Sequence, residues 1–88
     1  MKCAKEKLMD TGEAVRLRIL ELCQTNHITV NKLATISGIT QSTLNNIVSG
    51  RNQSATVSTI KKICDGLEIS IIEFFSSELF DHLEQEIK

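Results

Sequence analysis

The chain has 88 residues and is 41% hydrophobic, which is enough for one small globular domain. It contains no Pro, Trp or Tyr and only four Gly, a composition that favours helices over strands and turns. No apolar run is long enough to span a bilayer. The three cysteines, Cys3, Cys23 and Cys64, show no metal-ligand spacing, and their odd number without a secretory signal favours a reducing cytoplasm.

The net charge of −1 conceals an uneven distribution along the chain. Residues 1–62 carry nine Lys or Arg against four Asp or Glu, whereas residues 63–88 carry seven acids against one Lys. A basic front half with an acidic end fits a DNA-facing domain, although two ordinary solvated surfaces would give the same asymmetry. Charge alone therefore leaves both interpretations open.

The first predicted helix follows a patternless start. Residues 1–9 form a Lys-rich lead that we expect to be disordered. Asp10 and Glu13 then resemble a capping box, which predicts a helix that runs to about Gln24. Its apolar stripe at helical spacing consists of Val15, Ile19, Leu22 and Cys23.

Two short helices joined by a tight turn are predicted next. Thr29 is positioned to cap a helix over about residues 30–37, and Gly38 suits a turn that requires a positive φ. Thr40 is positioned to cap a second helix over about residues 41–48. The residues expected to hold this unit together are small or apolar: Leu33, Ala34, Gly38, Ile39, Leu44 and Ile47.

The remaining chain predicts three further helical segments. Thr56 caps a helix over about residues 57–67, and the capping box of Ser70 and Glu73 opens a short helix that includes two phenylalanines. Residues 77–88 have apolar side chains at a four-residue spacing, which predicts a last amphipathic helix. The expected fold is an all-α, compact bundle of five or six short helices, with one domain over residues 10–76 followed by this C-terminal helix.

The helix over residues 41–48 has the composition of a helix that reads DNA. Short uncharged polar side chains occupy one face, and Leu44 and Ile47 anchor the other. Amide and hydroxyl groups supply the donors and acceptors that match base edges in the major groove.

The pattern of Ala34, Gly38, Ile39, Leu44 and Ile47 resembles the lambda repressor/Cro-type helix-turn-helix domain of the Xre-like regulators of bacteria and phages. Residues 56–64 and 69–75 are similar to the family's fourth and fifth helices, so the resemblance spans about two thirds of the chain. It implies a lambda repressor-like fold that binds double-stranded DNA. The sequence shows no Ser-His-Asp arrangement, phosphate-cradling Gly loop or metal-ligand cluster, so we expect no catalysis, cofactor or metal.

The resemblance also implies roles for individual residues. Side chains that would contact bases are Gln41, Ser42, Asn45 and Asn46, and residues that would position the phosphates are Thr29, Thr40, Thr43, Arg51 and Asn52. The sequence departs from the family pattern at Cys23, His27 and Val30, of which the first and last replace polar groups near DNA. Fewer phosphate contacts predict a shallow dependence of binding on salt.

These implications lead to a transcriptional repressor that binds an inverted-repeat operator as a homodimer. The expected dimerisation residues are Leu79, Phe80, Leu83 and Ile87, unless the last helix instead folds back over the first. Two other functions stay open. One is an antitoxin whose acidic end binds a toxin and which also represses its own operon. The other is a helix-turn-helix protein-interaction module that does not bind DNA.

Overall fold

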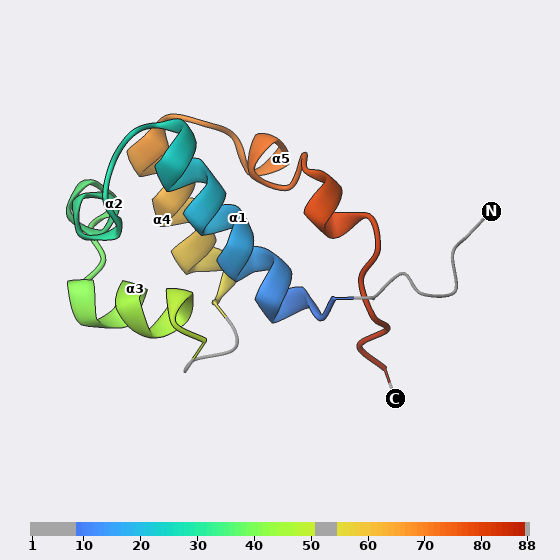
Figure 1. Ribbon diagram of the computed structural model, residues 1–88. Coiled ribbons are helices and arrows are strands. Elements are labelled where there is room, and N and C mark those ends of the chain that lie inside the picture. The colour runs from blue at the N-terminus through green and yellow to red at the C-terminus, as the bar shows by residue number, and fades with distance from the viewer. Residues whose placement is uncertain (1–8, 51–54, 88) are drawn as a thin grey trace.

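The computed structural model describes residues 9–50 and 55–87. The described residues form five α-helices and one turn of 3-10 helix, in the order α1 (Thr11–Thr25), α2 (Val30–Ser37), α3 (Gln41–Val48), α4 (Val57–Leu67), α5 (Ile71–Phe74) and η1 (Glu78–Phe80). Figure 1 shows α2 and α3 at one end of the molecule and η1 with the C-terminal tail at the other. The expected all-α helix bundle is confirmed.

Each α-helix begins after a residue whose side chain accepts a hydrogen bond from the backbone N–H three positions later. Such a cap satisfies one of the backbone donors that a helix start leaves free. The five acceptor and donor pairs are Asp10 and Glu13, Thr29 and Lys32, Thr40 and Thr43, Thr56 and Thr59, and Ser70 and Glu73. Because these signals are local, the predicted starts of the five helices agree with the structure.

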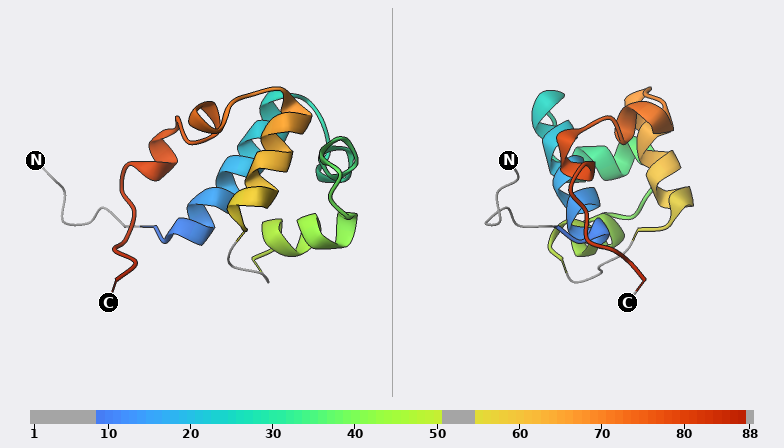
Figure 2. Two further views of the ribbon diagram at one scale, coloured as in Figure 1. Left: turned by 180° about the vertical axis from the view of Figure 1, so that it is seen from behind. Right: turned by 90° about the vertical axis from the view of Figure 1, so that its right-hand side faces the viewer.

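The core lies where α1, α2, α3 and α4 face one another, with α5 closing one side (Figure 2). Its largest fully buried side chains come from all five α-helices: Ile19, Leu33, Leu44, Ile63, Cys64 and Phe74. Helix α2 packs against both α3 and α4, and α3 also packs against α1, so two helices of the core hold α3 in position. Cys23 and Cys64 are buried free thiols, and burial raises the pKa of both.

Helices α2 and α4 approach each other closely at Gly66. A Cβ atom at this position would lie 2.7 Å from Ser37 Oγ and 2.9 Å from the carbonyl oxygen of Ile36. Sequence analysis assigned Gly66 no role. The structure shows that the missing side chain lets α4 contact the last turn of α2.

The C-terminal segment differs from the prediction. Residues 77–88 were expected to form an amphipathic helix, but their described part forms the single turn η1 and then an irregular chain. Phe80 packs against the rings of Phe74 and Phe75, with centroid distances of 6.3 and 4.8 Å. Two acids near the end, Glu84 and Glu86, would also oppose the negative C-terminal dipole of a longer helix.

The tail is attached to the start of α1 by one isolated parallel bridge between Met9 and Leu83. Met9 N donates to His82 O over 3.2 Å, and Glu84 N donates to Met9 O over 2.9 Å. Met9 therefore takes part in the fold, although the sequence placed it in a disordered lead. Residues 1–8 of that lead lie outside the described residues.

Candidate nucleic-acid interface

The helix-turn-helix is formed by α2, Gly38 and α3. Gly38 has φ 70° and ψ 28°, the left-handed conformation that glycine adopts without a steric penalty. Ile39 N then donates to Ala34 O over 3.0 Å, and the Ile39 side chain is partly buried against the core. These contacts close the turn, and Thr40 starts α3 immediately after it.

One side of α3 is anchored and the opposite side is exposed. Leu44 and Ile47 are 0% and 5% exposed, which places both in the core. At 100° per residue, the four candidate base-reading residues fall within an arc of about 140° on the opposite side. Within this arc Gln41, Ser42 and Asn45 are exposed, whereas Asn46 is half-buried. The structure thus brings all four onto one side of α3, with Asn46 the least accessible.

The candidate phosphate-binding residues divide into two groups. Thr29, Thr40 and Thr43 are exposed at the starts of α2 and α3. Thr40 donates its hydroxyl hydrogen to Thr43 Oγ1 over 2.8 Å, which leaves the hydroxyl hydrogen of Thr43 for an outside acceptor. Arg51 and Asn52 lie outside the described residues.

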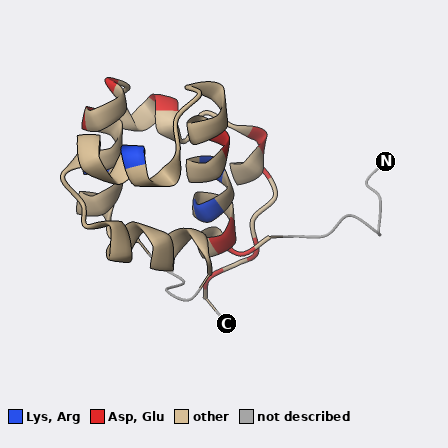
Figure 3. Ribbon diagram, turned by 60° about the vertical axis from the view of Figure 1, so that its left-hand side comes forward, with Lys and Arg blue, Asp and Glu red and all other residues tan. Residues whose placement is uncertain are grey.

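The charge around this surface is favourable for DNA because acids are absent from it. Neither α2 nor α3 contains Asp or Glu (Figure 3), and residues 22–64 contain none at all. Lys32 on α2 is exposed, whereas Lys61 on α4 is ion-paired with Asp65. The surface therefore has little negative charge to repel phosphates, and its described residues include few cations to attract them.

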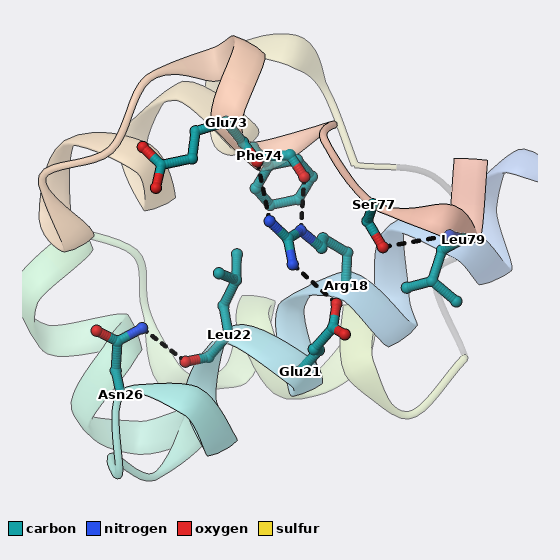
Figure 4. Close-up of polar contacts among 8 residues, drawn as sticks. All are labelled: Arg18, Glu21, Leu22, Asn26, Glu73, Phe74, Ser77 and Leu79. Carbon is teal, nitrogen blue, oxygen red and sulfur yellow. Dashed lines mark hydrogen bonds and ion pairs between the residues drawn. The ribbon is translucent and has the colours of Figure 1, made fainter. Parts of the chain in front are cut away.

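Two arginines that sequence analysis did not single out connect helices that are distant in the sequence. Arg16 donates to Val48 O over 3.5 Å, at the C-terminal end of α3. Arg18 donates to Phe74 O and Glu73 O over 2.6 and 2.9 Å and pairs with Glu21 over 2.8 Å (Figure 4). In the sequence, both are ordinary cations on an amphipathic helix, and nothing in the neighbouring residues indicates their distant partners.

The three departures from the family pattern have different structural roles. Cys23 is buried and Val30 is partly buried against the core, so neither can contact DNA through a polar group. His27 is exposed and has φ 58°, which fits a position where a turn-forming residue is common. A neighbouring polar residue, Asn31, is exposed, and sequence analysis did not assign it a role.

Within residues 9–50 and 55–87, no group of three His, Cys, Asp or Glu side chains could hold a metal ion. None of the helices described is long and apolar enough to cross a membrane. The anchored polar helix and its capped turn instead define a helix-turn-helix DNA-binding domain.

Comparison with known proteins supports this assignment. The family model of the Cro/C1-type HTH DNA-binding domain matches residues 18–78, and the chain belongs to this family. The crystal structure of prophage Lp1 protein 11 is similar, with 37% sequence identity and a TM-score of 0.71, over 80% of this chain and 92% of that one. A comparison with curated proteins found no match.

Proposed function

We propose that the protein is a sequence-specific transcriptional repressor that binds an inverted-repeat operator as a homodimer in the cytoplasm. The observation that carries this proposal is the exposed, uncharged polar face of α3. Leu44 and Ile47 anchor the opposite face in the core, so the orientation of the helix is set before DNA is met. Repression follows from occupancy of a promoter.

Gln41, Ser42, Asn45 and Asn46 are the proposed base-reading residues. Gln41 and Asn46 carry amides that can pair with adenine through one donor and one acceptor, and such a contact discriminates by about 1–3 kcal/mol. The phosphates are held at helix starts, where Thr29 and Thr43 have hydroxyl hydrogens directed to no other described residue.

A single helix-turn-helix reads few base pairs, so a two-fold dimer is proposed. The residues expected to form its interface are not all available, because Leu79, Phe80 and Leu83 are half-buried within the same chain. Among the four, Ile87 alone is exposed, with 82% of its surface accessible. Helix α5 and its C-cap provide further exposed apolar surface at Ile71, Ile72 and Phe75, which we propose as part of the dimer contact.

The test is a selection of bound duplexes from a random pool, at low and at moderate salt. Enrichment of an inverted repeat is expected, and its half-site spacing reports the dimer geometry. Salt-sensitive retention without an enriched motif would contradict sequence-specific reading. No retention would instead support the protein-interaction module.

The double variant Gln41→Ala with Asn46→Ala tests the polar face directly. It is expected to lose about tenfold or more in affinity for the enriched duplex, because two amide contacts are removed. Gln24→Ala is the matched control, since Gln24 is an exposed amide on α1 outside the helix-turn-helix. Unchanged binding by the double variant would refute the assignment of α3 as the reading helix.

A further inference from the structure

One side-chain hydrogen bond connects the two helices of the helix-turn-helix on their exposed side. Asn45 Nδ2 on α3 donates to Asn31 Oδ1 on α2 over 3.5 Å, and both side chains are exposed. The other hydrogen bonds between side chains of described residues join positions three or four apart on the same segment. The asparagine pair is therefore distinct, because it links two elements and includes a proposed base-reading residue.

The hydrogen bond leaves Asn45 with a defined set of unused groups. A side-chain amide has two N–H donors and one carbonyl acceptor. One donor of Asn45 points to Asn31, so its second N–H and its Oδ1 stay available to DNA. Adenine presents an acceptor at N7 and a donor at N6 in the major groove, which this donor and acceptor complement.

The orientation of the amide matters for discrimination between the two purines. Guanine presents two acceptors, N7 and O6, so an amide that turned freely could place its NH2 group towards guanine. The terminal torsion of Asn is broad and roughly two-fold, so nothing intrinsic to the side chain prevents this turn. When one N–H of Asn45 is held towards Asn31, its Oδ1 stays in place. Guanine would then present its acceptor O6 to the acceptor Oδ1, which is unfavourable.

We propose that Asn31 is a positioning residue that fixes the amide of Asn45 so that it reads adenine and rejects guanine. This inference rests on the proposed DNA-binding function. Val30, one residue earlier, is partly buried against the core and has no polar group to offer, whereas Asn31 is exposed in the first turn of α2. The side-chain hydrogen bond from α2 to α3 is therefore made at position 31.

A double-mutant cycle with Asn31→Ala and Asn45→Ala tests the proposal. The probes are the duplex that the wild-type protein enriches, a version with guanine in place of the adenine that depends most on Asn45, and a scrambled duplex. Asn31→Ala is expected to weaken binding to the enriched duplex by about threefold to tenfold, the size of one net hydrogen bond. Binding to the scrambled duplex should change by less than about twofold, because phosphate contacts are retained.

Two further variants separate positioning from other roles. Asn31→Asp keeps an acceptor for Asn45, so it should retain the preference for adenine over guanine while phosphate repulsion weakens its binding to every duplex. Thr35→Ala is the control on α2, because its hydroxyl donates only to the backbone of Asn31 over 3.1 Å.

The outcomes distinguish this inference from the function on which it rests. On an Asn45→Ala background, Asn31→Ala should change affinity by less than about twofold, so the cycle is non-additive. Additive losses, or equal losses on the enriched and scrambled duplexes, would show that Asn31 acts as a phosphate contact and would overturn the positioning role alone. A wild-type protein that enriches no sequence would overturn the proposed function and the positioning role together.

Discussion

Replacing Gly66 with Ala should have two opposing effects on stability, a gain in helix propensity and a steric clash with α2. Ala is favoured over Gly in a helix interior by about 1 kcal/mol, so an exposed site would gain stability. The added Cβ would lie 2.7 Å from Ser37 Oγ and 2.9 Å from Ile36 O, distances shorter than ordinary contacts. Because Ile36 O belongs to the backbone of α2, rotation of a side chain cannot relieve the second contact.

The steric effect should be the larger of the two. Overpacking a tight contact costs about 1–3 kcal/mol, occasionally more. Because Ile36 O is a backbone atom, we expect a cost in the upper part of this range, about 2–3 kcal/mol. After the gain of about 1 kcal/mol in helix propensity, Gly66→Ala should lower the free energy of unfolding by about 1–2 kcal/mol. In a domain of this size, each 1 kcal/mol lowers Tm by about 4–8 °C.

Urea and thermal unfolding, followed by circular dichroism, measure this change. Ser58→Ala, at an exposed position in α4, is the control that reports helix propensity without a new contact. Gly66→Ala with Ser37→Ala should recover part of the loss, because it removes the Oγ contact and a buried hydroxyl that has no partner among the described residues. A Gly66→Ala protein as stable as the wild type would show that the close approach of α2 and α4 is not required.

Two other predictions follow from buried groups. Arg18→Ala should cost about 2–3 kcal/mol of stability, because the carbonyls of Glu73 and Phe74 lose a charged donor. Glu21→Ala is the control for the exposed ion pair and should cost less than about 1 kcal/mol. Equal losses in urea unfolding would refute the role of Arg18 in holding α5. Burial raises the pKa of the Cys23 and Cys64 thiols in the folded state. The stability that they contribute is therefore fully present below the pKa of an unfolded cysteine, about 8.5, and is lost as pH rises through the folded-state pKa. Unfolding free energies measured from pH 7 to pH 10.5 should therefore fall at the alkaline end, and an unchanged value would contradict the burial of both thiols.

Much of the fold could be predicted because its signals act over three or four residues. The capping side chains Thr29, Thr40 and Thr56 mark helix starts, and Gly38 marks a turn with positive φ. A cap and the N–H that it accepts are neighbours in the chain, so their pairing needs no knowledge of distant segments. The sequence therefore predicted the bounds of α2, α3 and α4 and the exposed polar side of α3.

The prediction that residues 77–88 form a helix was wrong, because their apolar spacing does not by itself distinguish a helix from an irregular segment packed on the core. The spacing of Leu79, Leu83 and Ile87 fits a helix. In the structure, Phe80 instead packs on the phenylalanine rings near α5, and Leu83 pairs with Met9, more than seventy positions away. Contacts of this separation outweigh the weak helical preference of a short acidic segment.

The amino-acid sequence by itself determined the helix starts, the turn at Gly38 and the division of α3 into an anchored and a polar side. Only the tertiary structure decided that Gly66 must lack a side chain, that Arg18 holds α5, and that Asn31 meets Asn45. The physical reason is the range of the interactions. Capping and periodicity are properties of neighbouring residues, whereas close packing and hydrogen bonds between helices exist only after distant segments have been brought together.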